Sequence, residues 1–339
     1  MSNPALKQSQ QSIPQPKVKV LVFANNKGGI GKTTCATLAA EYAAMILKKR
    51  VLIVEMDGQM NMTSQWLPVD SVDGEREPIP HPDLTAEDLS EYNLRSSITD
   101  IWVHGKLVEP YPTPIGPEDR SDFDSPRVDV VSCSGSGMAE VLRTIGDDPN
   151  ALPKYGPVGA RAIPSKRVVD GLFSFIHNDV VAEYYDLVVI DTAPQKAAAF
   201  MASINSATHV VFPYTPEPFA VMGFGPGITE IRRINASFGG QRKEIDFIGF
   251  LPSKVDSRSA SHKEMIDKLC NARHSDVHFP PGLTVPKSEA IVRRSTYDRF
   301  DTQAAPSIFN LRPSDTVRKA CENTFSYILG RVFSGSLEN

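Results

Sequence analysis

The feature that most restricts the fold is a glycine-rich segment that reads Lys27-Gly28-Gly29-Ile30-Gly31-Lys32-Thr33-Thr34. It follows an apolar, β-branched run and precedes a stretch rich in alanine and leucine, so it joins a predicted strand to a predicted helix. Glycines at such a junction let backbone N–H groups surround phosphate oxygens, and the start of the helix adds positive potential. Lys32 can then reach the β- and γ-phosphates, and the Thr33 hydroxyl can ligate Mg²⁺. The segment therefore predicts a site for nucleotide phosphates.

Predicted strands and helices alternate along most of the chain. We expect strands at 17–25, 50–55, 127–133, 185–194, 208–214 and 245–256, and helices at 35–49, 94–103, 138–145, 166–183, 217–238, 261–273 and 313–333. Most of these strands are almost continuously apolar, which is typical of a parallel sheet that is covered by helices on both faces. The order predicts an α/β fold with a doubly wound, mostly parallel sheet flanked by helices.

The predicted organisation is one nucleotide-binding domain over residues 18–333, with a disordered, polar leader at 1–17 and a tail at 334–339. Two proline-rich stretches interrupt the domain, an acidic insertion at 67–126 and a loop at 147–165. Residues 55–148 hold 20 Asp and Glu but 6 Lys and Arg, a net charge of −14, whereas the whole chain carries −4 and the remainder +10. Four widely spaced cysteines predict reduced thiols rather than a zinc site.

A second lysine, Lys27, stands directly before the glycine pair. The pattern K-G-G-x-G-K-[ST]-T resembles the deviant Walker A signature of the ParA/MinD group of P-loop ATPases. The resemblance implies a P-loop fold, ATP and Mg²⁺ as cofactors, and a homodimer that closes around two nucleotides. Lys27 would then contact the partner subunit's phosphates and act in hydrolysis together with Lys32. ATP would be held by Lys27, Gly28, Gly29, Ile30, Gly31, Lys32, Thr33 and Thr34.

Two further segments resemble the switch regions of that group. Residues 55–63 (EMDGQMNMT) resemble the pattern D-x-D-P-Q-G-N-x-T, which implies that Asp57 orients the attacking water near Mg²⁺. Three residues depart from this pattern, namely Glu55, Gly58 and Met60. Residues 188–194 (VVIDTAP) resemble the Walker B segment, so the implied metal site consists of Asp191, Asp57 and Thr33.

The segments 250–258 (FLPSKVDSR) and 284–287 (TVPK) resemble the late strand and loop that hold the base in this group. Pro286 would therefore be an ATP-binding residue. The tetrapeptide that ends in Asp256 can also be read as the guanine-recognising T-K-x-D of related GTPases. The rest of the pattern favours ATP.

Among the functions found in the group, the sequence favours DNA segregation. An ATP-bound dimer would bind DNA without sequence preference in the cytoplasm, on the nucleoid, and a ParB-like partner would stimulate slow hydrolysis. Residues 242–331 hold 15 Lys and Arg against 11 Asp and Glu. Their expected phosphate-contacting face consists of Arg293, Arg294, Arg299, Arg318 and Lys319. Because 26 residues precede Lys27, we expect no N-terminal helix-turn-helix domain for operator-specific binding.

Alternative functions stay open. The same ATPase core would serve a protein that positions another cargo, such as a protein cluster or a conjugation complex, or a switch with negligible turnover. Membrane cycling of the MinD kind requires a basic amphipathic C-terminal helix. Residues 325–335 are apolar but hold one basic residue, Arg331, so we expect no stable membrane anchor. An iron-protein-like reductase is excluded, because no cysteine follows Asp191 in TAPQK. A further hypothesis is that the acidic insertion contacts a basic segment of a partner.

Overall fold

A seven-stranded sheet forms the centre of the computed structural model, which describes residues 14–72, 74–85, 87, 95–105, 109–117, 121–144, 165–193, 198–217, 224–271, 277–295 and 307–335. The strand order is β5-β6-β2-β7-β1-β8-β9. The strands are β1 (Lys19–Phe23), β2 (Arg50–Met56), β5 (Tyr111–Pro112), β6 (Arg127–Val131), β7 (Leu187–Thr192), β8 (His209–Tyr214) and β9 (Asp246–Pro252). All neighbours pair in parallel except β5, which runs antiparallel to β6. This confirms the predicted sheet.

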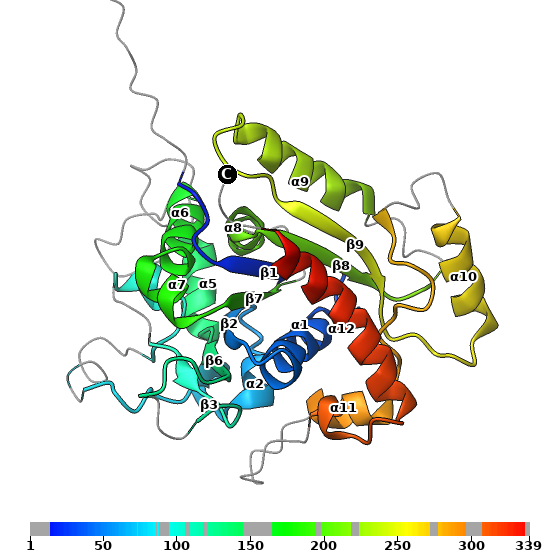
Figure 1. Cartoon of the computed structure of the whole chain (residues 1–339). Coiled ribbons are helices and arrows are strands. Elements are labelled where there is room, and N and C mark those ends of the chain that lie inside the picture. Colours follow the sequence, from blue (N-terminus) through cyan, green and yellow to red (C-terminus); the bar gives the residue numbers. More distant parts are fainter. Residues whose placement is uncertain are drawn as a thin grey trace, which may run out of the picture.

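Helices cover both faces of the sheet (Figure 1). Successive side chains of a strand point to opposite faces, so each strand contributes to two apolar cores. Leu21 and Phe23 of β1 pack with one group of elements, which consists of α1 (Lys32–Glu41), the π-helical turn Tyr42–Ile46, α2 (Thr63–Trp66), α11 (Glu289–Ser295), the 3₁₀ turn Ile308–Asn310 and α12 (Thr316–Ser334). Val20 and Val22 pack with the other group, which consists of α4 (Asp100–Val103), α5 (Gly135–Thr144), α6 (Ser165–Ile176), α7 (Asp179–Tyr184), α8 (Ala198–Ser206), α9 (Phe224–Ser237) and α10 (Ala260–Cys270).

Several predicted helices differ from the observed ones. The helix expected at 35–49 is α1 followed by the π-helical turn that ends at Ile46, and the helix expected at 217–238 is α9 from Phe224, with 218–223 outside the described residues. The helix expected at 166–183 is divided into α6 and α7, because the Asn178 side chain accepts a hydrogen bond from the Val181 amide (2.7 Å) and so begins a new helix. The helix expected at 94–103 is limited to the single turn of α4, because the described residues 95–99 are not helical and Ser97 forms an isolated parallel bridge with Ser132. Residues 1–13, most of the 147–165 loop and residues 336–339 lie outside the described part of the chain.

Part of the insertion has regular structure that the sequence pattern did not predict. Strands β3 (Val69–Val72) and β4 (Glu75–Pro78) form an antiparallel hairpin, and β5 extends the central sheet by one strand. Ile98, Trp102 and Tyr111 bury their side chains against the domain. The insertion therefore packs on the domain through a few apolar residues that are scattered among its many acidic ones.

The last helix, α12, packs its apolar side chains into the protein. Phe325, Ile328, Leu329 and Val332 are fully buried in the core that also contains α1. This arrangement opposes the membrane-cycling alternative, in which the same residues would enter a lipid surface. Within the described residues, we find no helix whose length and apolar character would let it cross a bilayer.

Candidate nucleotide site

The predicted site lies where the central strands end. The phosphate loop follows β1, Asp191 lies near the end of β7, and Asp57 comes directly after β2. The register places Asp191 between Phe23 of β1 and Glu55 of β2. The carboxyl ends of adjacent parallel strands meet at one edge, which is where ligands bind in open α/β sheets.

The phosphate loop adopts a conformation that depends on two of its glycines. Gly29 (φ 73°) and Gly31 (φ 94°) lie in the left-handed region, which side chains disfavour, and α1 begins directly after Gly31. The buried Lys32 ammonium group donates a hydrogen bond to the Lys27 carbonyl (3.2 Å). Burial lowers the pKa of Lys32, while Asp191 and Asp57 act in the opposite direction. The loop thus presents backbone N–H groups and one lysine at the same point.

The end of β9 fixes the loop from the other side. The Ser253 hydroxyl donates a hydrogen bond to the Ile30 carbonyl, and the Lys254 ammonium group donates one to the Gly29 carbonyl (2.6 Å). A Cβ atom at Gly31 would lie 3.0 Å from Ser253 Oγ, so the close approach of these segments favours glycine there. These two contacts satisfy the Gly29 and Ile30 carbonyl groups and so fix the conformation of the loop.

Thr33 and Asp191 form the part of the site that suits a divalent cation. The Thr33 hydroxyl donates a hydrogen bond to Asp191 Oδ2 (2.6 Å), and Asp191 Oδ1 is buried without a hydrogen bond to any described residue. Burial raises the pKa of Asp191 to about 7, against the hydrogen bond from Thr33 and the charge of Lys32. An unsatisfied carboxylate oxygen beside a hydroxyl fits Mg²⁺, which takes few protein ligands and keeps several waters.

Asp57 begins a tight turn that is held by hydrogen bonds. Asp57 Oδ1 accepts a hydrogen bond from the Gln59 amide (3.0 Å), and its carbonyl accepts one from the Met60 amide (2.9 Å). Met60 has φ 53°, a left-handed conformation that is uncommon for any residue but glycine. Its side chain is fully buried. The turn places Asp57 beside the phosphate loop.

Glu55, one of the departures from the switch pattern, holds the end of the turn that begins at Asp57. Its carboxylate accepts hydrogen bonds from the Met62 and Thr63 amides (2.8 Å each) and from the Thr63 hydroxyl. Burial, together with the neighbouring Asp191, raises the pKa of Glu55 to about 8. The extra methylene of Glu relative to Asp lets β2 hold the far end of the turn.

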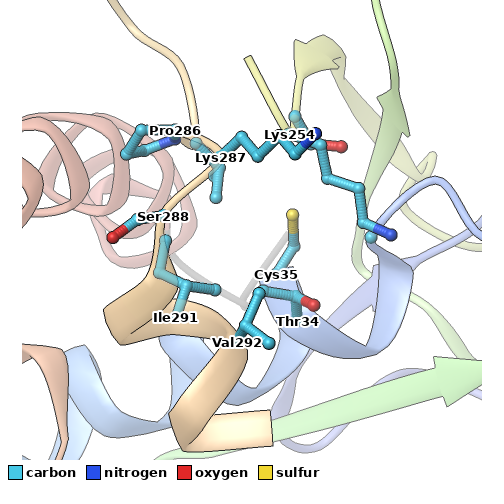
Figure 2. A pocket seen from close by; sticks show the side chains of 11 residues that line it. Thr34, Cys35, Lys254, Pro286, Lys287, Ser288, Ile291 and Val292 are labelled. Atoms are coloured by element: carbon cyan, nitrogen blue, oxygen red, sulfur yellow. The ribbon is translucent and has the colours of Figure 1, made fainter. Parts of the chain in front are cut away.

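A cavity of about 190 Å³ lies next to the phosphate loop (Figure 2). Pro286, Ile291 and Val292 form apolar walls, and the Cys35 thiol points into the cavity from α1. Asp256 is absent from the described lining residues; its carboxylate instead accepts hydrogen bonds from Arg258. The cavity thus has apolar walls of the kind that pack against a flat ring, and its described lining includes no carboxylate.

The Lys27 side chain forms an ion pair within its own subunit. Its ammonium group lies 3.2 Å from Glu217 Oε2, and both side chains are about half exposed. Glu217 follows β8 and is not among the residues predicted for the site. An exposed ion pair of this kind is weak and is readily exchanged for another partner.

The five residues expected to contact DNA have different environments. Arg293 and Lys319 are exposed, Arg318 is partly buried and donates to Glu322 and the Leu311 carbonyl, and Arg299 lies outside the described residues. The expectation for Arg294 is wrong, because its side chain is buried and forms an ion pair with the buried Glu41. Arg294 therefore cannot reach a phosphate of bound DNA.

A second cavity, of about 520 Å³, lies between the insertion and α6–α7, and we call it the insertion groove. Asp83, Glu109 and Asp129 contribute carboxylates, and its apolar lining includes Tyr184 and the exposed Val180. The insertion groove and the cavity beside the phosphate loop have no described lining residue in common.

Comparison with known sequences agrees with this geometry. The family model described as CobQ/CobB/MinD/ParA nucleotide binding domain matches residues 21–299. The Protein IncC of Escherichia coli is 24% identical over 257 residues, which are 75% of this chain and 55% of IncC, so the chain spans about half of that relative. A virulence plasmid ParA family protein, pGP5-D of Chlamydia psittaci, is 20% identical over 311 residues, covering 87% of this chain and 93% of the relative.

Solved structures share the fold. A variant of Cyanothece McdA in complex with ATP has a TM-score of 0.60 at 16% identity, covering 93% of this chain and 97% of McdA. The pNOB8 ParA bound to nonspecific DNA has a TM-score of 0.57 at 16% identity, covering 94% and 100%. Cobyrinic acid a,c-diamide synthase of Mycobacterium smegmatis, with bound ADP and magnesium, has a TM-score of 0.56 at 17% identity, covering 94% and 97%.

Proposed function

Because this chain belongs to the CobQ/CobB/MinD/ParA nucleotide-binding family, we propose that it is a Mg²⁺-dependent ATP hydrolase of the DNA-partition type. One observation carries the proposal. The phosphate loop, the hydrogen-bonded pair of Thr33 and Asp191, and the turn that begins at Asp57 meet at one edge of the sheet, beside a cavity for a base.

The proposed chemistry is in-line attack of water on the γ-phosphate, in which positioning and charge do most of the work. Lys32 and the N–H groups of the loop bind phosphate oxygens, and Asp57 orients the water. Thr33 and Asp191 would hold Mg²⁺, which neutralises charge on the phosphate oxygens when it is bound. The position of Asp256 outside the base cavity supports ATP over GTP.

We propose that ATP also closes two subunits into a dimer that binds DNA without sequence preference. The exposed position of Lys27 supports a role in contacting the partner subunit's nucleotide, because a weak ion pair with Glu217 is all that the described structure shows for its ammonium group. The exposed Arg293 and Lys319 support a DNA-contacting face, as does the likeness to a ParA that was solved on nonspecific DNA. Such binding would place the protein on the nucleoid.

The test is binding to a random-sequence DNA duplex, measured by fluorescence anisotropy with ATP, with ADP and without nucleotide. We expect binding with ATP alone, and a steep fall in affinity between low and moderate salt because counterions are released from DNA. Lys32→Ala should abolish ATP binding and therefore DNA binding. If the wild-type protein bound ATP but no DNA at low salt, the partition proposal would fail and positioning of another cargo would replace it.

For the partner, we propose a ParB-like or other adaptor protein that docks a basic segment into the insertion groove. Two exposed carboxylates, Asp83 and Glu109, line the groove, whereas Asp129, Arg127 and His81 in its lining are buried. Val180 is 63% exposed and Phe123, which contacts the lining residue Tyr184, is 49% exposed. Charge complementarity and exposed apolar groups therefore favour a segment that combines lysine or arginine with apolar side chains.

A further inference from the structure

The turn after Asp57 is in contact with the insertion hairpin. The Arg76 guanidinium donates a hydrogen bond from Nη1 to the Gln59 carbonyl (2.6 Å) and lies 3.5 Å from Asn61 Oδ1. These two residues flank Met60, the residue with the left-handed backbone. Arg76 therefore bridges the turn at the position where its conformation is least favourable for a side-chain-bearing residue.

The position of Arg76 is itself fixed by neighbouring contacts. The next residue, Glu77, is buried, and its carboxylate accepts a hydrogen bond from the Ser136 amide (2.9 Å) at the start of α5. A Cβ atom at Gly135 would lie 2.7 Å from the Arg76 carbonyl, so the hairpin and α5 are in direct contact there. On the opposite side, Arg95 donates to the Pro78 carbonyl (3.4 Å). These contacts with α5 and Arg95 fix the strand that carries the Arg76 side chain.

The turn is held at three points by different elements. Asp57 holds the Gln59 and Met60 amides from within, Glu55 of β2 holds the Met62 and Thr63 amides, and Arg76 of β4 holds the outer side. The first two sets of contacts come from the turn itself and from the adjoining strand β2, whereas the third comes from the insertion. Packing against α5 at Gly58 and the buried Met60 side chain also limit the turn, but Arg76 supplies the side-chain hydrogen bond to the Gln59 carbonyl.

We infer that Arg76 is a positioning residue of the hydrolytic site: it holds the turn at 57–61 so that Asp57 is placed for water, and it makes the insertion part of that site. This inference rests on the proposed ATP hydrolysis. It acts on the water-orienting group and leaves the phosphate loop untouched, so its removal should lower kcat and leave the KM for ATP nearly unchanged.

The experiment compares Arg76→Ala, Arg76→Lys and Glu75→Gln in the full chain with ATP and Mg²⁺. Glu75 is the matched control, because it is the exposed neighbour on the same strand. We expect kcat to fall about tenfold in Arg76→Ala, with the KM within about twofold, as for loss of a charge-assisted hydrogen bond that positions a reacting group. Arg76→Lys should recover most of kcat, and Glu75→Gln should equal the wild type.

Hydrogen–deuterium exchange of the amides in 57–63 supplies a second measurement that does not depend on turnover. We expect faster exchange there in Arg76→Ala and unchanged exchange in Glu75→Gln. Unchanged kcat and exchange in Arg76→Ala would overturn the inference, and so would equal losses in both arginine variants accompanied by a lower melting temperature. If the wild type hydrolysed no ATP, faster exchange in Arg76→Ala would keep the positioning role while the proposed function failed, and unchanged exchange would reject both.

Discussion

Arg294 shows how the environment of one residue is decided by its place on a helix. Arg293 and Arg294 are adjacent in the sequence, and together they predict a basic surface. On α11, however, consecutive residues point about 100° apart, so one side chain faces solvent and the other faces α1. Arg294 donates to Glu41 and to the Gln65 carbonyl, and its guanidinium stacks on the Trp66 ring. It fastens α11 to the domain.

Replacement of Arg294 by alanine should therefore destabilise the protein strongly. The variant leaves the Glu41 carboxylate buried with the Ser307 hydroxyl as its remaining described partner, and we expect a loss of about 3 to 5 kcal/mol in the free energy of unfolding. Arg293→Ala, at the exposed neighbour, should cost less than about 0.5 kcal/mol. Urea unfolding followed by circular dichroism measures both. A stable Arg294→Ala protein that had lost only DNA affinity would restore the surface role that we reject.

Glu55 and Met60 show that a departure from a sequence pattern can have a structural reason. Glu55 reaches two backbone amides beyond the turn, and Met60 buries its side chain in the core while its backbone takes the left-handed form. Burial of the methionine side chain stabilises the protein by about 2 kcal/mol, which offsets a backbone cost of about 1 kcal/mol. From the sequence alone, these two residues looked like weaknesses of the motif.

At the scale of elements, the secondary structure of the insertion was the hardest to predict from the sequence. Its hairpin, β3 and β4, follows no clear alternation, because Asp and Glu occupy most of the positions between its few apolar residues. Both of its structural roles depend on tertiary contacts: one edge reaches the Asp57 turn, and the segment after β4 lines the insertion groove. Local propensity is a weak guide when packing decides the conformation.

The groove predicts a measurable charge preference. A fluorescein-labelled peptide that alternates lysine and leucine should bind the protein, and its glutamate–leucine counterpart should not. The variant Asp83→Lys/Glu109→Lys should weaken binding at least tenfold, because it reverses the two exposed charges at the groove. The control Glu264→Lys/Asp267→Lys, on the exposed side of α10, should have little effect. Equal losses in both variants would mean that the peptide responds to total charge and not to the groove.

At the scale of the whole molecule, the proposed function depends on a second copy of the chain. Lys27 is the residue proposed to contact the second copy, and in the single subunit it is paired with Glu217. An exposed pair of this kind contributes about 0.2 to 1 kcal/mol, so a phosphate group of a second subunit can replace the carboxylate. The charge distribution fits the same arrangement: acidic residues concentrate in 55–148, and the remainder of the chain is basic.

Light scattering with ATP tests the role of Lys27. Lys27→Ala should bind ATP as the wild type does but stay monomeric, because the cation that contacts the partner subunit's nucleotide is lost. Glu217→Gln should dimerise at least as readily as the wild type, because it releases Lys27 from its intrasubunit pair. An ATP-dependent dimer of Lys27→Ala would refute this role.

The sequence by itself determined the sheet and the glycine loop between its first strand and helix, and it supplied the candidate residues for a phosphate site. Those features depend on contiguous residues: apolar strands next to a glycine loop, and a carboxylate at the end of a strand, have few ways to fold. The tertiary structure alone decided which segments Glu55, Lys254 and Arg76 contact, that Arg294 is buried, and that the insertion reaches the turn after Asp57. Those contacts join segments that lie far apart or follow no pattern of their own, and their energies exist only once the chain has packed.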